Sequence, residues 1–472
     1  MLNGNEILEK CRLHGAVVLG FGISNVPLTD FLLSEGIKVE VRDGKSRDAV
    51  APYVNIDEYE KKGVTFRFGD AYLENIPAGV LFRTPGLRPD ADGIMDAVSR
   101  GALLTSEMEL FYALSPSHKL AITGSDGKTT TTTLVNLILK DVFASDNINI
   151  GLGGNIGAPL LPRVHELGGD DFAVTELSSF QLMTMPIPPE VAVITNVSPN
   201  HLNWHTDMNE YTEAKLRIIS DGCRVAVLNY RDDACRLAAG KTSAKVVYFS
   251  SVPISDDVTD AVYLNGDSIL LRRDGTEKAI LSRSAIKLPG LHNVENYMAA
   301  IAAVSAFVSD ERLACSADTI ARSFGGVPHR LEFVREIDGI SAYNGSIDSS
   351  PSRTAAALSA LSDKRISLIC GGYDKHIPMK PLAEAVAAHG GVLSVTLTGD
   401  IAPIIADALD ELDTAPEHTV IPDFDDAVRH AYERAKALGA DTLLLSPAAA
   451  SFDHFRNFEE RGEHFKKLVR EL

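Results

Sequence analysis

A glycine-containing stretch that ends in a lysine and two threonines carries the strongest chemical signal in the sequence. Residues 124–130 read Gly-Ser-Asp-Gly-Lys-Thr-Thr and directly follow a predicted strand at 119–123. Glycines let backbone N–H groups close around phosphate oxygens, and the first turn of a following helix adds partial positive charge. The pattern predicts a loop that binds nucleotide phosphates, with Lys128 at the β- and γ-phosphates and the Thr129 hydroxyl on Mg²⁺.

The loop departs from the general phosphate-loop pattern in one place. That pattern has a glycine five residues before Gly127, and Ile122 stands there, so the loop is a shortened variant that begins at Gly124. An ordinary strand-to-helix turn with a solvent-facing lysine is the alternative interpretation. The pattern by itself predicts nucleotide binding and no particular reaction.

Three further polar side chains follow the loop, and two of them, Glu176 and His201, could bind a metal ion. Glu176 follows one apolar strand, His201 follows the next, and Lys215 lies on the helix after them. A carboxylate at the carboxyl end of a parallel strand points into the crevice where ligands bind, and carboxylates suit Mg²⁺. Singly, these residues are typical of a solvated glutamate, a structural histidine and a surface lysine. They gain weight as functional candidates only as a set, because each follows the phosphate loop in the same predicted α/β domain.

These side chains need a scaffold, and the sequence predicts one in which strands and helices alternate. Strands are expected at 16–19, 38–41, 119–123, 172–175, 191–195, 225–228, 366–369, 392–397 and 442–445, and helices through 31–33 and at 208–219, 294–307, 354–361, 381–388 and 424–438. Repeated alternation of this kind indicates an α/β fold with mostly parallel sheets and helices on both faces.

Turn-rich breaks near residues 114–116 and 324–328 predict three domains. They are a Rossmann-like N-terminal domain (1–114), a central phosphate-loop domain with a mostly parallel sheet (115–326), and a C-terminal Rossmann-like domain (327–472). The first turn, Gly20-x-Gly22, lacks the third glycine of a dinucleotide fingerprint because Asn25 stands there. The turn could bind NAD, it could bind a different nucleotide, or it could be a tight turn with no ligand.

The composition is that of a globular protein, and it limits the classes of partner and the compartment that we expect. The 472 residues are 45% hydrophobic and carry a net charge of -19, which argues against nucleic acid as a partner. The five cysteines are scattered without a C-x-x-C pair, so we expect buried thiols in a reducing compartment. We see neither a secretory apolar segment nor an apolar run of ~20 residues, and we therefore expect a cytoplasmic protein without membrane insertion.

Several motifs, in order along the chain, resemble those of the Mur ligase family. They are residues 124–130, Thr175-Glu-Leu-Ser-Ser-Phe-Gln-Leu182, Asn196-Val197 with His201, Leu288-Pro-Gly-Leu-His292-Asn293-Val-Glu-Asn296, and Pro328-His329-Arg330. The stretch 175–182 and the C-terminal segment 445–462 are most similar to members that add D-glutamate to UDP-N-acetylmuramoyl-L-alanine.

The resemblance implies a division of labour among the three domains. The first would bind the UDP sugar, the second ATP with two Mg²⁺ ions, and the third the adenine nucleotide and D-glutamate. The acceptor carboxylate would attack the γ-phosphate of ATP, and the amine of D-glutamate would then attack the acyl phosphate. The implied partners are these small molecules, with no nucleic acid and with the chain acting as a monomer.

The resemblance also implies roles for individual residues. The catalytic set is Lys128, Glu176, His201 and Lys215, and the metal set is Thr129, Glu176, His201 and Lys215, the lysine being carbamylated. The ATP set is Gly124, Ser125, Asp126, Gly127, Lys128, Thr129, Thr130, His292, Asn293, Asn296, Arg330 and Asp348. The UDP-sugar set is Gly22, Ser24, Asn25, Arg42, Asp43 and Asn155, and the D-glutamate set is Lys375, Ser451 and Phe458.

The sequence departs from the family pattern at three positions. Asn200 stands where many members have aspartate, and Gly345 and Ile347 stand where an aspartate and a lysine are common. Either Asp348 replaces the missing carboxylate at 345, or the loop runs differently from that of other members.

Three competing functions stay open. A different Mur enzyme or a folate polyglutamate synthetase would release ADP with an amino acid other than D-glutamate. An NAD-dependent dehydrogenase would bind NADH and not ATP. A non-catalytic regulator would bind ATP without ligation.

Overall fold

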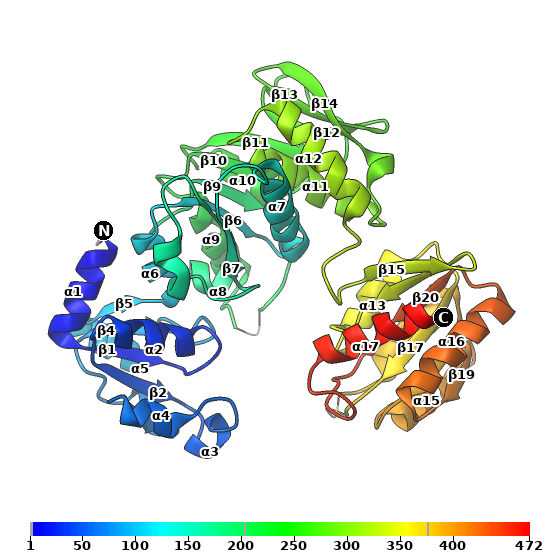
Figure 1. The fold of residues 1–472 in the computed structure, drawn as a ribbon, viewed down its shortest axis with the longest axis horizontal. Helices are drawn as coiled ribbons and strands as arrows, with labels where there is room; N and C mark the ends of the chain where they lie inside the picture. Colours follow the sequence, from blue (N-terminus) through cyan, green and yellow to red (C-terminus); the bar gives the residue numbers. More distant parts are fainter. Residues whose placement is uncertain (1–2, 203, 375–376) are drawn as a thin grey trace. The chain divides into compact units, whose positions relative to one another are not determined.

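The computed structural model describes residues 3–202, 204–374 and 377–472, which form three β-sheets with flanking helices (Figure 1). The chain separates into two compact units. One contains residues 1–284 with 294–320, and the other contains 285–293 with 321–472. The predicted α/β class is confirmed, because each sheet is wholly or mainly parallel.

The N-terminal sheet is fully parallel with strand order β3-β2-β1-β4-β5. Its strands are β1 (Ala16–Leu19), β2 (Val39–Asp43), β3 (Thr65–Phe68), β4 (Val80–Arg83) and β5 (Leu103–Thr105), and its helices are α1 (Gly4–His14), α2 (Asn25–Ser34), α3 (Arg47–Val50), α4 (Ile56–Lys61), α5 (Asp92–Ser99) and α6 (Glu107–Leu114), with a 3-10 turn at Asp70–Leu73. All four residues of β1 are buried, as expected for a central strand covered on both faces. The strand order reverses between β1 and β4, the kind of point at which ligands of open α/β sheets generally bind.

The central sheet has nine strands in the order β14-β13-β12-β11-β10-β9-β6-β8-β7. Its strands are β6 (His118–Thr123), β7 (Ile150–Gly154), β8 (Phe172–Glu176), β9 (Val191–Ile194), β10 (Val225–Asn229), β11 (Lys245–Ser250), β12 (Ala261–Asn265), β13 (Ser268–Arg273) and β14 (Thr276–Ser282). Its helices are α7 (Lys128–Val142), α8 (Ser179–Leu182), α9 (Met208–Leu216), α10 (Asp233–Ala239), α11 (Leu291–Val304) and α12 (Asp310–Ser323), with 3-10 turns at Leu161–Glu166, Arg217–Ile219 and Arg283–Ala285. The phosphate loop therefore joins β6, inside the sheet, to α7.

An antiparallel edge of the central sheet was not predicted. Strands β12, β13 and β14 pair antiparallel, and Asp274 and Gly275, both with positive φ, form the turn between the last two. An Asp-Gly pair in this conformation is a strong hairpin signal. Outside this edge the sheet is parallel, so its predicted character holds.

The C-terminal sheet has six strands in the order β15-β16-β20-β17-β18-β19, and only β15 is antiparallel. The strands are β15 (Glu332–Ile337), β16 (Ile340–Asn344), β17 (Ile366–Gly371), β18 (Val392–Thr398), β19 (Glu417–Val420) and β20 (Thr442–Leu445), and the helices are α13 (Pro351–Ala360), α14 (Lys380–His389), α15 (Ala402–Asp410), α16 (Phe424–Leu438) and α17 (Phe458–Glu471). Leu444 packs in one apolar cluster with α13, α14 and α15, whereas Leu443 and Leu445 pack in a second with α16 and α17. Helices thus cover both faces, as predicted.

The cysteines differ in one respect from expectation. Cys11, Cys223, Cys235 and Cys370 are buried free thiols, but Cys315 is exposed, so the prediction that all five are buried was wrong. The reason is that Cys315 lies on an outward-facing position of α12. Across the described residues, we find no helix with the length and apolar character needed to span a bilayer.

Candidate active site

Two glycines give the phosphate loop a shape that other residues could not adopt. Gly124 has φ 145°, and a Cβ there would lie 1.8 Å from Thr195 Oγ1. Gly127, which precedes α7, has φ 79°, and a Cβ there would lie 2.4 Å from Asn296 Oδ1. Because L side chains rarely adopt these φ values, both positions require glycine. The backbone is therefore open to close approach by a ligand.

Gly124→Ala is expected to destabilise the protein by at least about 1–3 kcal/mol, the cost of a residue in a sparsely populated backbone region. Thr195 is buried at the end of β9 and cannot move aside easily. The free energy of unfolding, measured by urea denaturation, checks this. Gly169→Ala is the control, since Gly169 is exposed and a Cβ there would meet no atom of the described residues within 4 Å. Equal stability of the two variants would contradict the steric argument.

Hydrogen bonds to the segments after β9 hold the loop in place. Ser125 Oγ lies 2.8 Å from both the carbonyl oxygen of Ser198 and the hydroxyl of Tyr211. The amide of Asp126 donates to Asn196 Oδ1 at 3.0 Å. Sequence reasoning assigned no role to Ser198 or Tyr211. The position of Asn196 just after a buried strand is the signal that could have found it as an anchor of the loop.

Glu176 lies beside the start of α7, as its position at the end of β8 predicts. Parallel pairing of β8 with β6 sets Glu176 opposite Ile122, directly before the phosphate loop. Its Oε2 accepts a hydrogen bond from Thr129 Oγ1 at 2.8 Å, and its Oε1 accepts one from Asn155 Nδ2 at 2.8 Å. The hydroxyl and the carboxylate are hard oxygen donors of the kind that Mg²⁺ prefers.

This pair of donors fits a magnesium ion that is also held by substrate. Within residues 3–202, 204–374 and 377–472, no three His, Cys, Asp or Glu side chains converge into a metal site of their own. Mg²⁺ usually takes one or two protein oxygens and completes its shell with phosphates and water. Glu176 and Thr129, next to a phosphate loop, match that mode. The wider metal set with His201 and Lys215 stays a prediction.

Lys215 is buried and directed at the loop. Its side chain is 2% exposed, and Nζ donates to the carbonyl oxygen of Gly124 at 2.7 Å. Burial, together with the nearby charge of Lys128, lowers the pKa of Lys215 to about 7. A surface lysine was the alternative interpretation, and burial excludes it. Near neutral pH a large share of this amine is uncharged.

The depressed pKa of Lys215 predicts how stability depends on pH. Between about pH 7 and the ordinary lysine pKa of 10.5, the unfolded chain binds a proton that the folded chain does not, so stability rises with pH. Between pH 7.5 and 9, wild type should gain about 2 kcal/mol relative to Lys215→Met in carbonate-free buffer. Urea denaturation across this range measures the difference. Parallel pH profiles for the two proteins would contradict it.

His201 and His205 follow β9 in different environments. His201 is exposed, has φ 55°, and its ring lies 5.0 Å from that of Phe180. Partial burial and then the charges of Lys128 and Lys215 lower its pKa, which favours the neutral, metal-binding form. His205, missed by sequence reasoning, is 2% exposed and therefore buried. Asn200 Oδ1 accepts from the His201 amide at 2.8 Å, a task that an amide performs as well as an aspartate.

Four of the predicted UDP-sugar residues, Gly22, Ser24, Asn25 and Asp43, lie on or beside the first turn of the N-terminal sheet. Asn25 Nδ2 donates to the carbonyl oxygen of Gly20 at 2.8 Å, and Asp43 Oδ2 accepts from the amide of Phe21 at 2.8 Å. These bonds shape the turn that contains Gly22 and Ser24.

The Arg42 guanidinium is buried and donates to the carbonyl oxygens of Tyr72 and Glu74, so it braces the segment after β3. Its predicted contact with the UDP sugar stays a prediction. Asn155, from the same predicted set, lies instead in the central part of the molecule, against Glu176.

The predicted adenine-side residues divide between the two compact units. Asn296 belongs to the first unit, where its Oδ1 accepts from Thr131 Oγ1 at 3.2 Å beside Gly127. His292 and Asn293 belong to the second unit, and Asn293 Nδ2 donates to the carbonyl oxygen of Pro289 at 2.7 Å. Arg330 is exposed in the second unit.

Asp348 occupies the space that a side chain at position 345 would fill. A Cβ at Gly345 would lie 2.5 Å from Asp348 Oδ2. The same oxygen accepts from Ser446 Oγ at 2.9 Å, and burial raises the pKa of Asp348 to about 6. A side chain at position 345 would therefore collide with Asp348, and the substitution of Asp348 for a carboxylate at 345 stays a prediction.

Two of the three predicted D-glutamate residues follow strands of the C-terminal sheet. Ser451 is buried after β20, and the carbonyl oxygen of Phe458 accepts from Ser346 Oγ at 2.8 Å. Arg461, which sequence reasoning did not single out, is 2% exposed and also bonds Ser346. Lys375 lies outside the described residues.

A glycine-shaped phosphate loop between a parallel strand and a helix, with a hydroxyl and a carboxylate beside it, defines a nucleotide-dependent α/β enzyme. Residues 122–304 match the Mur ligase middle domain, and residues 329–449 match the Mur ligase, glutamate ligase domain. The chain belongs to the Mur ligase family, a family of ATP-dependent amide-forming ligases.

Relatives match along nearly the whole chain. The UDP-N-acetylmuramoylalanine–D-glutamate ligase of Clostridium kluyveri is 44% identical over 471 residues, covering 98% of this chain and 97% of that protein. The protein of the same name from Acetivibrio thermocellus is 42% identical over 478 residues, covering 99% and 98%. This membership favours a ligase over the dehydrogenase and the regulator.

Solved structures share the fold at low identity. UDP-N-acetylmuramate–alanine ligase MurC from Thermotoga maritima aligns with a TM-score of 0.54 and 18% identity, over 97% of this chain and 99% of that one. UDP-N-acetylmuramoyl-L-alanyl-D-glutamate–2,6-diaminopimelate ligase aligns with a TM-score of 0.55 and 17% identity, over 100% and 94%. The multidomain α/β fold is therefore that of the family.

Proposed function

We propose that this protein joins D-glutamate to UDP-N-acetylmuramoyl-L-alanine, in the synthesis of a peptidoglycan precursor. The observation that carries the proposal is the Thr129–Glu176–Asn155 group beside the phosphate loop. The names of relatives more than 40% identical over almost the full chain support the choice of substrates. The reaction would consume ATP and release ADP and phosphate in the cytoplasm, with the protein acting as a monomer.

The proposed reaction solves a simple chemical problem. A carboxylate is a poor acylating agent, so the acceptor carboxylate attacks the γ-phosphorus of ATP, and ADP leaves. The amine of D-glutamate then attacks the acyl phosphate, loses a proton, and phosphate departs as the amide forms. Bound Mg²⁺, in two sites, would offset phosphate charge during transfer.

The chain's own residues would position the reacting phosphate and the cations and would offset their charges. Lys128 would donate to the transferring phosphate, and Thr129 and Glu176 would hold the first cation. His201 would supply a neutral imidazole for a second cation. Lys215, once its uncharged amine has added CO₂ and released a proton, would present an anionic carbamate in place of a cation.

Binding roles follow the three proposed domains. In residues 1–114, Gly22, Ser24, Asn25, Arg42 and Asp43 would surround the UDP group, and Asn155 in residues 115–326 would reach the acceptor end. The remaining ATP contacts would be Gly124, Ser125, Asp126, Gly127, Thr130, His292, Asn293, Asn296, Arg330 and Asp348. In residues 327–472, Lys375, Ser451 and Phe458 would hold D-glutamate.

The test is an assay with purified protein, ATP, Mg²⁺, UDP-N-acetylmuramoyl-L-alanine and one amino acid at a time. Phosphate release and a product heavier by one glutamate residue are expected with D-glutamate only. Turnover with meso-diaminopimelate or L-alanine but not D-glutamate would replace the proposed substrate. ATP binding without any ligation would remove the proposed reaction.

A further inference from the structure

The loop at 84–90 borders the proposed UDP-sugar crevice at its first residue. Thr84 follows β4, and a Cβ at Gly20, on the turn after β1, would lie 2.7 Å from Thr84 Cγ2. Strands β1 and β4 are neighbours at the point where the strand order reverses. Ligands of open α/β sheets bind outside the carboxyl ends of strands at such a point. A ligand in this crevice therefore lies against the start of the loop.

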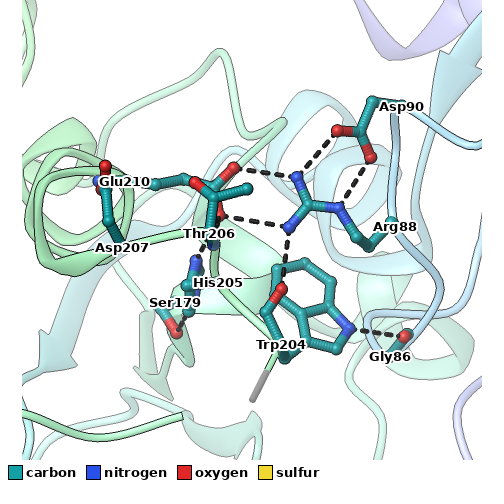
Figure 2. Close-up of polar contacts among 9 residues, drawn as sticks. All are labelled: Gly86, Arg88, Asp90, Ser179, Trp204, His205, Thr206, Asp207 and Glu210. Carbon is teal, nitrogen blue, oxygen red and sulfur yellow. Dashed lines mark hydrogen bonds and ion pairs between the residues drawn. The ribbon is translucent and has the colours of Figure 1, made fainter. Parts of the chain in front are cut away.

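The far end of the same loop is bonded to the central part of the molecule through Arg88 (Figure 2). Its guanidinium donates to both carboxylate oxygens of Glu210, at 2.8 and 3.1 Å, and to the carbonyl oxygen of Trp204 at 2.8 Å. Asp90 accepts two more of its hydrogen bonds. The indole N–H of Trp204 donates to the carbonyl oxygen of Gly86 at 2.9 Å. We call Gly86, Arg88, Trp204, His205 and Glu210 the Arg88 cluster.

The Arg88 cluster continues to the segments that carry the proposed metal ligands. His205 Nδ1 lies 3.1 Å from Glu210 Oε2, and its Nε2 lies 2.9 Å from Ser179 Oγ, at the start of α8 (Figure 2). The rings of Trp204 and Phe180 lie 4.4 Å apart, and that of Phe180 lies 5.0 Å from His201. His201 is thus packed against a ring that is fixed from the loop at 84–90.

A second, independent hydrogen bond joins the end of β4 to helix α8. Arg83, at the end of β4, is 1% exposed and donates to the carbonyl oxygen of Phe180 at 2.8 Å. Arg83 therefore holds the Phe180 backbone directly, whereas Arg88 acts on the Phe180 ring through Trp204. Planar, bidentate arginine contacts fix geometry more tightly than a lysine would.

We propose that Arg88 is a positioning residue that couples occupation of the UDP-sugar crevice to the placement of His201 for metal binding. The inference rests on the proposed function, which supplies both ligands. A ligand against Thr84 orders the loop, the loop orders Trp204 and His205, and these order the ring on which His201 packs. Because such coupling is reciprocal, the acceptor sugar should tighten metal binding, and the metal should tighten acceptor binding, by the same factor.

The test uses a metal-binding readout, so it does not depend on turnover. The dissociation constant of Mn²⁺ is measured by electron paramagnetic resonance with a non-hydrolysable ATP analogue, with and without UDP-N-acetylmuramoyl-L-alanine. In wild type the acceptor should tighten Mn²⁺ binding by about 5-fold or more. Arg88→Ala should reduce this factor to less than about 2-fold. Arg88→Lys, which keeps the charge but loses the fork of hydrogen bonds, should reduce it as well.

Trp204 supplies a second readout, since it is the single tryptophan of the chain. Its emission should change when the acceptor binds to wild type in the absence of metal and nucleotide, and this change should be lost in Arg88→Ala. Arg47→Ala is the matched control, because Arg47, on helix α3 of the N-terminal region, also pairs with two carboxylates, Asp57 and Glu60 of α4. It should keep both responses.

Separate outcomes test the coupling and the proposed function. Acceptor binding is measured first by calorimetry on wild type. If the acceptor does not bind, the proposed function is wrong and the coupling fails with it. If it binds, and folded Arg88→Ala or Arg88→Lys keeps the wild-type coupling factor and emission change, the coupling alone is overturned.

Discussion

Lys128→Ala is expected to lower kcat by about 10²–10³-fold, since one well-placed donor to a transition state contributes about 3–4 kcal/mol. Lys128 is the first residue of α7, where the helix terminus also favours an anion. Its Nζ donates to the carbonyl oxygen of Ser125 at 2.8 Å, within the loop that would surround the phosphates. The measurement is phosphate release under saturating substrates.

The matched control is Lys140→Ala, an exposed lysine near the end of the same helix. It removes the same charge far from the loop and should keep kcat within about two-fold, as surface substitutions usually have small effects. Far-UV circular dichroism should show both variants folded. Near-normal turnover of Lys128→Ala would remove the assignment of residues 124–130 as the phosphate loop.

Glu176→Gln is expected to lower kcat by about 10²-fold or more and to raise the Mg²⁺ concentration needed for half-maximal activity. The change keeps the size of the side chain and removes the negative charge that the cation requires. It also sets an amide where Thr129 Oγ1 and Asn155 Nδ2 both donate, so one of the two bonds loses its acceptor. A Mg²⁺ titration of phosphate release measures both effects.

Glu166→Gln is the control for the loss of one carboxylate. Glu166 pairs with the exposed Arg163 at a 3-10 turn and has no proposed role in metal or nucleotide binding. Its Mg²⁺ dependence should equal that of wild type. A Glu176→Gln variant with unchanged Mg²⁺ dependence would show that Glu176 does not hold the metal.

Local sequence patterns determined the elements that carry the chemistry. The apolar run at 16–19 forms β1, and the helical pattern at 424–438 forms α16, with the predicted bounds. The phosphate loop could be read because each requirement, strand, glycines, lysine and helix start, lies within a dozen residues. Backbone preferences and the spacing of apolar residues act over this distance, so one sequence suffices to predict them.

Only the tertiary structure decided which distant side chains meet. Parallel pairing of β8 with β6 brings Glu176 to the phosphate loop, and packing buries Lys215, whose sequence neighbours predict a surface position. Nothing near Arg88 in the sequence indicates that it bonds Glu210, more than a hundred residues away. Such contacts depend on sheet register and on the packing of one layer against another, which no local pattern records. That is why the phosphate loop could be predicted from the sequence, whereas the hydrogen bonds between Arg88 and Glu210 could not.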